Sequence, residues 1–178
     1  MFFVDAAHFV LGSYLGWLWC AVRLFVRAAS GRQRYNVLGA WNATTQELIR
    51  VTNHTYVTAT TVCELLQKIA ALGLGVPITL VLDNARYQRC ELVQSLARQL
   101  GIELLFLPSY SPNLNLIERL WKFTKKKALQ SRHHTNYADF HAAVDQCLDQ
   151  IATEHKQEIS SLMTLNFQTF QDVPLLRA

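Results

Sequence analysis

The chain has 178 residues, of which 51% are hydrophobic, so it is long enough and apolar enough to bury one core. Its 17 Lys and Arg against 13 Asp and Glu give a net charge of +4, which suits a polyanionic partner without identifying one. The apolar run Phe9–Val22 is 14 residues long, short of the roughly 20 that a membrane span needs, so we expect no membrane attachment. The four cysteines form no C-x-x-C pair, so we expect free thiols and a cytoplasmic protein.

The first part of the chain predicts strands. Phe2–Asp5 is a short aromatic and β-branched run that ends on an acid, and Trp17–Phe25 and Tyr35–Trp41 have similar composition. The turn residues Ser30–Arg32 separate the last two. Glu47–Thr52 alternates polar and apolar residues, which predicts a hairpin partner for the strand before it.

The middle of the chain alternates helices and strands. Thr60–Leu72 carries apolar residues at helical spacing and stops at Gly73, which predicts a helix. Ile78–Leu82 is an unbroken aliphatic run, typical of a strand covered on both faces. Gln88–Leu100 then predicts a helix and Ile102–Leu107 a second buried strand.

The last part is helical. After the loop Pro108–Pro112, we expect a helix that starts near Pro112 and runs through Lys125–Lys127, followed by a helix over Tyr137–Glu154. Residues at helical spacing in the first of these should face the core: Leu114, Ile117, Leu120, Trp121 and Thr124. The tryptophans are expected in the core rather than as base-stacking platforms: Trp17, Trp19, Trp41 and Trp121.

Three acids stand where a predicted element meets a loop. Asp5 and Asp83 each end a predicted strand, and Glu118 lies in the first part of a helix. Neighbouring strands would bring the two aspartates together, and a helix across the sheet edge would aim Glu118 at the same point. Converging carboxylates repel one another, and hard divalent cations such as Mg²⁺ relieve that repulsion. Taken singly, Asp83 also fits a turn or helix cap, and Glu118 a solvated first-turn acid.

The amino-acid sequences around the three acids are more specific than the spacing of the acids. They read FVDAAHF at residues 3–9, VLDNARY at 81–87 and PSYSPNLNLIERLW at 108–121, and 34 residues separate Asp83 from Glu118. Together they closely resemble the DDE transposases of the mariner-like insertion-sequence group. The third block carries most of the resemblance, because generic helix capping does not require such a string. The resemblance covers about residues 1–130.

The resemblance implies a ribonuclease-H-like fold: an α/β mixed five-stranded sheet flanked by helices, with residues 1–130 as the catalytic core and 131–178 as a C-terminal helical extension. It implies that Asp5, Asp83 and Glu118 are the catalytic triad and bind two Mg²⁺ or Mn²⁺ ions. The implied activity is hydrolysis of phosphodiester bonds at transposon ends, followed by attack of the freed 3′-hydroxyl on target DNA.

Basic residues near the acids are candidates for contacts with DNA phosphates. Lys122 and Lys125 share a helix face with Glu118, with Lys126 beside them, and Arg86 and Arg89 follow the second aspartate. The alternatives are an i,i+4 ion pair between Lys122 and Glu118, a solvated helix end, and a polar helix start.

Transposases of this group also carry a helix-turn-helix region before the first catalytic aspartate, whereas Asp5 lies at the start of this chain. We therefore expect a homodimer, or assembly with a separate helix-turn-helix part, acting on DNA at the nucleoid. One alternative is a truncated, non-catalytic product that occupies DNA or dimerises with a full-length transposase and inhibits it. Another is a phospho-acceptor signalling domain, against which the predicted antiparallel strands speak.

Overall fold

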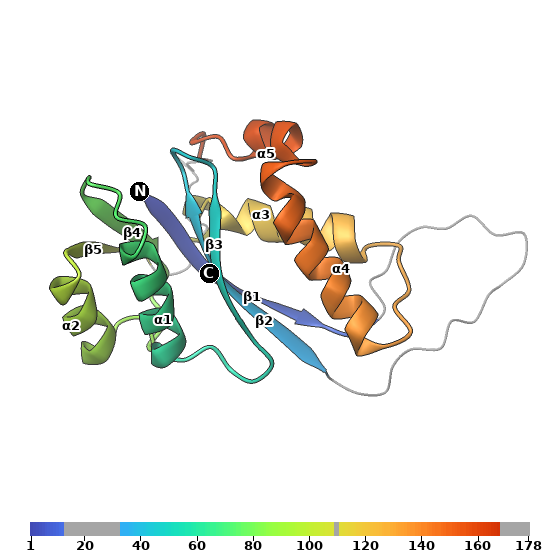
Figure 1. Ribbon diagram of the computed structural model, residues 1–178, viewed down its shortest axis with the longest axis horizontal. Helices are drawn as coiled ribbons and strands as arrows, with labels where there is room; N and C mark the ends of the chain where they lie inside the picture. Colours follow the sequence, from blue (N-terminus) through green and yellow to red (C-terminus); the bar gives the residue numbers. More distant parts are fainter. Residues whose placement is uncertain (13–32, 109–110, 168–178) are drawn as a thin grey trace, which may run out of the picture.

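The computed structural model describes residues 1–12, 33–108 and 111–167, which form a five-stranded sheet with helices on both faces (Figure 1). The strands are β1 (Phe2–Val10), β2 (Arg34–Asn42), β3 (Leu48–Asn53), β4 (Ile78–Leu82) and β5 (Ile102–Phe106). Their order in the sheet is β3-β2-β1-β4-β5, with the first three antiparallel and β4 and β5 parallel to β1. The predicted mixed sheet is therefore confirmed.

The helices are α1 (Ala59–Ala70), α2 (Glu91–Gln99), α3 (Ile117–Thr124), α4 (Tyr137–Asp149) and α5 (Lys156–Leu162). Successive residues of a strand point to opposite faces of a sheet, and β1 shows this directly. Phe2 and Val4 lie in the core beneath α1 and α2, whereas Phe3, Ala7 and Phe9 lie in the core beneath α3 and α4. Asp5 has the same parity as Phe3 and Ala7, so it points toward α3.

The helix predicted over Thr60–Leu72 is confirmed as α1. Its apolar spacing buries Val62, Leu65, Leu66 and Ile69 against the sheet. The backbone N–H of Thr58 donates to Thr61 Oγ1 at 3.2 Å, which satisfies a group that the first helical turn leaves unpaired. Gly73 follows the helix at φ +56, a conformation that favours glycine.

Two predicted boundaries are wrong, and tertiary contacts explain one of them. β1 continues past Asp5 to Val10, because β2 pairs with it from Phe2↔Asn42 to Val10↔Arg34. α2 begins at Glu91 rather than at Gln88, after a turn over residues 86–88. The strand expected over Trp17–Phe25, the turn at 30–32 and the residues Trp17, Trp19 and Cys20 lie outside the described residues.

The helix expected from Pro112 is also different. Residues Pro112–Leu114 form a single 3₁₀ turn, η1, and α3 starts only at Ile117. α3 then passes directly into a π-helical turn, η2, over Lys125–Leu129. The predicted core face is largely confirmed, because Ile117, Leu120, Trp121 and Thr124 are buried.

The C-terminal part packs on the same core as α3. Phe140, Val144 and Leu148 of α4 belong to the cluster that contains Phe9 and Trp121. The short helix α5, which the sequence did not predict, follows a 3₁₀ turn, η3 (Gln150–Ala152). Within the described ranges no helix is long and apolar enough to cross a membrane.

Candidate active site

Asp5 and Asp83 lie beside each other at the point where the parallel pairing of β1 and β4 ends. The two strands pair in register from Phe2↔Leu80 to Val4↔Leu82, and the aspartates are the next residue on each. β4 stops there, whereas β1 runs on beside β2. Asp5 is thus half-buried in the interior of β1, still paired with Gly39 of β2 on one side but just past the last residue paired with β4 on the other.

Glu118 reaches the same region from α3. This helix is held on β1 and β2 by the buried side chains of Ile117, Leu120 and Trp121, and Glu118 lies in its first turn. The negative charges of Glu118 and Asp83 both act on Asp5, since each raises the pKa of the Asp5 carboxyl. Three acids from distant parts of the chain therefore form one electrostatic cluster.

The segment that carries Glu118 also holds both aspartates. The Asn115 side-chain amide donates from Nδ2 to the Val4 carbonyl at 3.0 Å and to Asp83 Oδ1 at 3.1 Å. Trp121 donates from its indole Nε1 to Asp5 Oδ2 at 3.0 Å. The prediction that Trp121 belongs to the core is confirmed, but its polar atom faces the acid cluster.

The loop after Asp83 is fixed to β5. Asn84 donates from Nδ2 to the Leu107 carbonyl at 2.5 Å, and the Leu107 N–H donates to the Leu82 carbonyl at 2.8 Å. The end of β4 is thereby tied to its neighbour from both directions, which limits where Asp83 can move.

Burial and crowding change the ionisation of the cluster. Burial is the main cause that raises the pKa of Asp5 from 3.8 to about 7, and the negative charges of Glu118 and Asp83 add to it. Hydrogen bonds from the Ala6 backbone and the Trp121 indole act in the opposite direction. Strongly shifted carboxyls in a group of acids are typical of functional sites.

Tyr87 is a neighbour of the site that the sequence reasoning missed. Its pKa is raised to about 12, first by burial and then by the charges of Asp5 and Asp83, so its hydroxyl stays protonated beside the acids. A tyrosine after Asp-Asn-Ala-Arg carries no local signal of this, because the contact depends on how the loop folds back.

The donors of the cluster fit a hard divalent cation. Mg²⁺ and Mn²⁺ prefer oxygen ligands, and the site offers three carboxylates. Asn84 Oδ1 and Asn115 Oδ1 are buried amide oxygens that have no hydrogen-bond partner among the described residues. In the described part of the chain, however, no three Asp, Glu, His or Cys side chains are grouped closely enough to hold an ion as they stand. Side-chain rotation toward a cation would be required, and the cation itself would relieve the repulsion opposing it.

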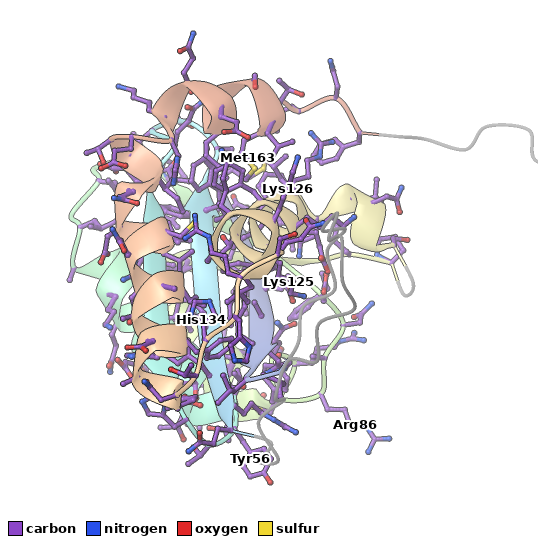
Figure 2. All side chains as sticks on the ribbon, turned by 90° about the vertical axis from the view of Figure 1, so that its right-hand side faces the viewer. Tyr56, Arg86, Lys125, Lys126, His134 and Met163 are labelled. Atoms are coloured by element: carbon purple, nitrogen blue, oxygen red, sulfur yellow. The ribbon has the colours of Figure 1, made fainter. Side chains whose placement is uncertain are left out.

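The basic residues predicted to contact DNA are all exposed, but they do not form one patch. Lys125 and Lys126 lie together at the end of α3, whereas Arg86 projects from another part of the surface (Figure 2). Arg89 lies over the Phe106 ring at 5.3 Å, and the exposed Lys122 is on α3 itself. The candidate basic residues therefore form two separate regions, one following Asp83 and one following Glu118 in the sequence.

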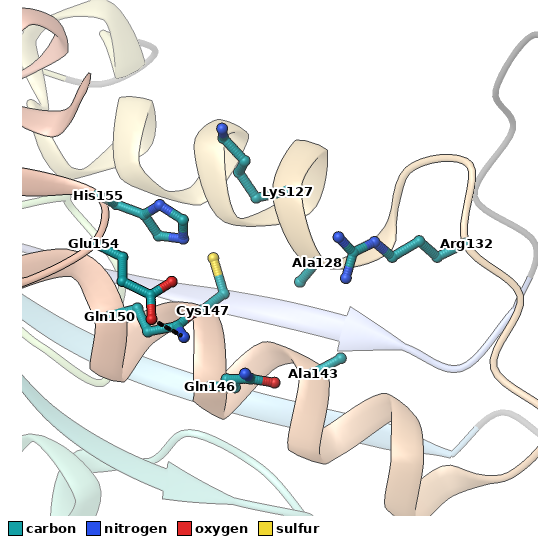
Figure 3. Close-up of a pocket in the computed structure, with 9 residues that line it drawn as sticks. All are labelled: Lys127, Ala128, Arg132, Ala143, Gln146, Cys147, Gln150, Glu154 and His155. Carbon is teal, nitrogen blue, oxygen red and sulfur yellow. Dashed lines mark hydrogen bonds between the residues drawn. The ribbon is translucent and has the colours of Figure 1, made fainter.

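A pocket of about 250 Å³ lies between η2 and α4 (Figure 3). None of Asp5, Asp83 and Glu118 lines it. It contains the Cys147 side chain, whose thiol has its pKa raised to about 11, mainly by burial. Lys127 lines it too and pairs with Glu158 at 2.8 Å. Among the described residues, Cys63, Cys90 and Cys147 are free thiols.

A mixed five-stranded sheet of this strand order, flanked by helices, is the fold of the ribonuclease-H-like class of domain. Within that class, the family model of the DDE superfamily endonucleases matches residues 1–141, and the chain belongs to this family. Among curated protein sequences, none matches the chain.

Solved structures share the fold at low sequence identity. A Mos1 transposase paired-end complex with the left transposon end has a TM-score of 0.60 at 12% identity, covering 90% of this chain and 55% of that one. A mariner Mos1 paired-end complex with Mg gives 0.59 at 13%, covering 92% and 55%. A simian T-cell lymphotropic virus intasome, in complex with the PP2A regulatory subunit B56 gamma, gives 0.52 at 15%, covering 86% and 48%. The chain thus spans about half the length of these proteins.

Proposed function

We propose that this chain is the catalytic domain of a DNA transposase, which cleaves phosphodiester bonds at transposon ends and joins the freed 3′-hydroxyl to target DNA. The observation that carries the proposal is that Asp5 and Asp83 follow directly on the last paired residues of β1 and β4, and that the charges of Asp83 and Glu118 both raise the pKa of the Asp5 carboxyl. Family membership and the similarity to Mos1 complexes with transposon DNA support it.

In this proposal Asp5, Asp83 and Glu118 hold two Mg²⁺ or Mn²⁺ ions. Solved Mos1 paired-end complexes with Mg and with Mn support the choice of metal. Bound ions supply charge neutralisation at the scissile phosphate and a hydroxyl nucleophile at neutral pH. The protein's own contribution is positioning, because Asn115 and Trp121 fix the two aspartates before any ligand binds.

Phosphate contacts would come from the basic residues around the cluster. Lys122, Lys125 and Lys126 extend from the helix of Glu118, and Arg86 and Arg89 from the loop of Asp83. Such contacts hold the duplex in register without reading its sequence. Recognition of a particular transposon end would then depend on a homodimer or on a separate helix-turn-helix part, and the protein would act at the nucleoid in the cytoplasm.

The test is a titration of Mn²⁺, followed by calorimetry, with plasmid nicking scored in parallel. The wild-type chain is compared with the triple variant Asp5→Asn/Asp83→Asn/Glu118→Gln. A matched control changes three exposed acids instead, Glu64→Gln/Glu103→Gln/Asp139→Asn, so that both variants gain the same positive charge.

We expect the triple variant to lose both Mn²⁺ binding and nicking, and the control variant to keep both. Metal binding without nicking in the wild-type chain would favour the rival function, a non-catalytic product that occupies DNA or pairs with a full-length transposase. Equal behaviour of the wild-type chain and the triple variant would refute the proposed site.

A further inference from the structure

The indole of Trp121 connects the hydrophobic core to the acid cluster. Its side chain is 2% exposed and packs edge-on against Phe9, with ring centroids 6.4 Å apart. Its one polar atom, Nε1, donates to Asp5 Oδ2 at 3.0 Å. A large ring fixed by packing holds the donor, and through it the carboxylate, in one orientation.

Gly39 provides the space that this arrangement needs. It lies on β2 directly opposite Asp5, and a Cβ at that position would be 2.7 Å from Cη2 and 2.9 Å from Cζ2 of Trp121. The same Cβ would be 3.1 Å from Ile117 Cδ1. Any larger residue would therefore push the indole away from the sheet.

The glycine is not explained by its backbone. Three other glycines have positive φ, among them Gly73 and Gly101, whereas Gly39 sits in ordinary strand pairing without that conformation. A glycine in a strand interior weakens it and often marks a site of close approach. At Gly39 the approaching group is the Trp121 ring.

A second buried tryptophan shows that the bond to Asp5 does not follow from burial alone. Trp41 is 0% exposed and belongs to the same core cluster as Trp121. Its Nε1 has no hydrogen-bond partner among the described residues. The core thus tolerates one unpaired indole N–H, whereas the other is aimed at a carboxylate.

The chemistry of the donor suits a metal ligand. An indole N–H donates one hydrogen bond and does not ionise near neutral pH. It orients the carboxylate but leaves its negative charge available, whereas a lysine or arginine in the same place would compete with a cation.

We infer that Trp121 is a positioning residue for Asp5, and that Gly39 sets the place of its ring. This inference rests on the proposed function, because its purpose is to present Asp5 to a divalent cation. Removing a hydrogen-bond partner that orients a metal ligand typically lowers the affinity for the metal by about 10- to 100-fold. We expect Trp121→Phe, which keeps the aromatic packing but removes the donor, to weaken Mn²⁺ binding in that range.

The experiment compares Trp121→Phe with Trp41→Phe, an identical substitution in the same core, by Mn²⁺ calorimetry and by urea unfolding in EDTA. The expected result is a loss of Mn²⁺ affinity for Trp121→Phe alone. Gly39→Ala is added alone and in the Trp121→Phe background. If glycine acts through the indole, Gly39→Ala weakens Mn²⁺ binding in the wild-type background and has a much smaller effect in the Trp121→Phe background, where the two indole atoms nearest the added Cβ are gone and only the 3.1 Å contact with Ile117 remains.

A spectroscopic readout separates positioning from a general structural role. The Trp121 indole N–H resonance, assigned by its absence in Trp121→Phe, should shift when Mg²⁺ is added to the folded wild-type chain. Equal Mn²⁺ affinities for Trp121→Phe and Trp41→Phe, with an unmoved indole resonance, would overturn the inference while leaving the proposed function intact. A wild-type chain that binds no Mn²⁺ would overturn both.

Discussion

Replacing Asp5 by asparagine should stabilise the metal-free protein at neutral pH. The Asp5 carboxyl is buried among like charges, which raises its pKa from 3.8 to about 7. Asparagine has the same shape and keeps an oxygen that can accept the Trp121 hydrogen bond. The substitution therefore removes the unfavourable charge with little change in packing.

The size of the effect follows from the difference in pKa between the folded and unfolded states. Below pH 3.8 the carboxyl is protonated in both states, so it contributes no pH dependence. Between 3.8 and about 7 the unfolded chain releases the proton first, and the folded state loses stability as the pH rises. At about 1.4 kcal/mol per pKa unit, the penalty above pH 7 is on the order of 4 kcal/mol.

Urea unfolding in EDTA at pH 4 and pH 8 measures this directly. We expect Asp5→Asn to exceed the wild-type free energy of unfolding at pH 8 and to match it at pH 4. Asp139→Asn, an exposed acid on α4, is the control for a simple change of net charge. Adding Mg²⁺ should reverse the order, because the wild-type chain gains stability from binding. An Asp5→Asn variant no more stable than wild type at pH 8 would refute the account of the cluster.

Three further results are expected. Asp83→Asn should abolish plasmid nicking while the chain stays folded by circular dichroism, and nicking above background would overturn its assignment. Lys122→Gln and Lys125→Gln should each lower the salt dependence of DNA binding, reducing the slope of log K against log salt by about 1, as seen by fluorescence anisotropy. Tyr35→Phe loses the 2.6 Å bond to Asp145 and should lower the free energy of unfolding by about 1 kcal/mol near neutral pH. Burial and Asp145 raise the Tyr35 pKa, so the wild-type advantage should fade in urea titrations as the pH rises above about 10.

Local patterns predicted the elements whose stability is local or whose burial is complete. α1 has a clear apolar stripe, and the aliphatic run of β4 was correctly predicted as a strand inside the sheet. The prediction of a second buried strand over Ile102–Leu107 is wrong in its burial, because β5 lies at the edge of the sheet and Leu105 is 48% exposed. β1 was predicted too short because Asp5 resembles a strand end. What extends the strand is the backbone pairing with β2, to which side-chain polarity is no guide. α5 was missed because only Ile159 within it is buried, leaving almost no periodic signal.

The same limit applies to the site. The sequence blocks predicted Asp5, Asp83 and Glu118 as the site, and in the structure the charges of Asp83 and Glu118 both act on the Asp5 carboxyl. The groups that hold them were not identified, because Asn115 contacts Val4 across 111 residues and Trp121 contacts Asp5 across 116. From the sequence, Asn115 was placed inside a helix that starts near Pro112, and Trp121 was predicted as a core residue. Both interpretations fit the local pattern, and neither predicts the distant residues to which these side chains donate hydrogen bonds.

The late start of α3 follows from the needs of the site. If the helix had begun at Pro112, Asn115 would lie within regular helix, and its side chain would have to reach Val4 and Asp83 from there. Instead η1 ends at Leu114, and Asn115 lies between the two helical segments with its amide bound to β1 and to Asp83. From Asn115, Glu118 and Trp121 follow at intervals of three residues, close to one helical turn, so all three side chains can face the same sheet edge. One short segment therefore supplies an acid and orients the other two, and the packing of α3 on β1 and β2 determines the geometry of the whole cluster.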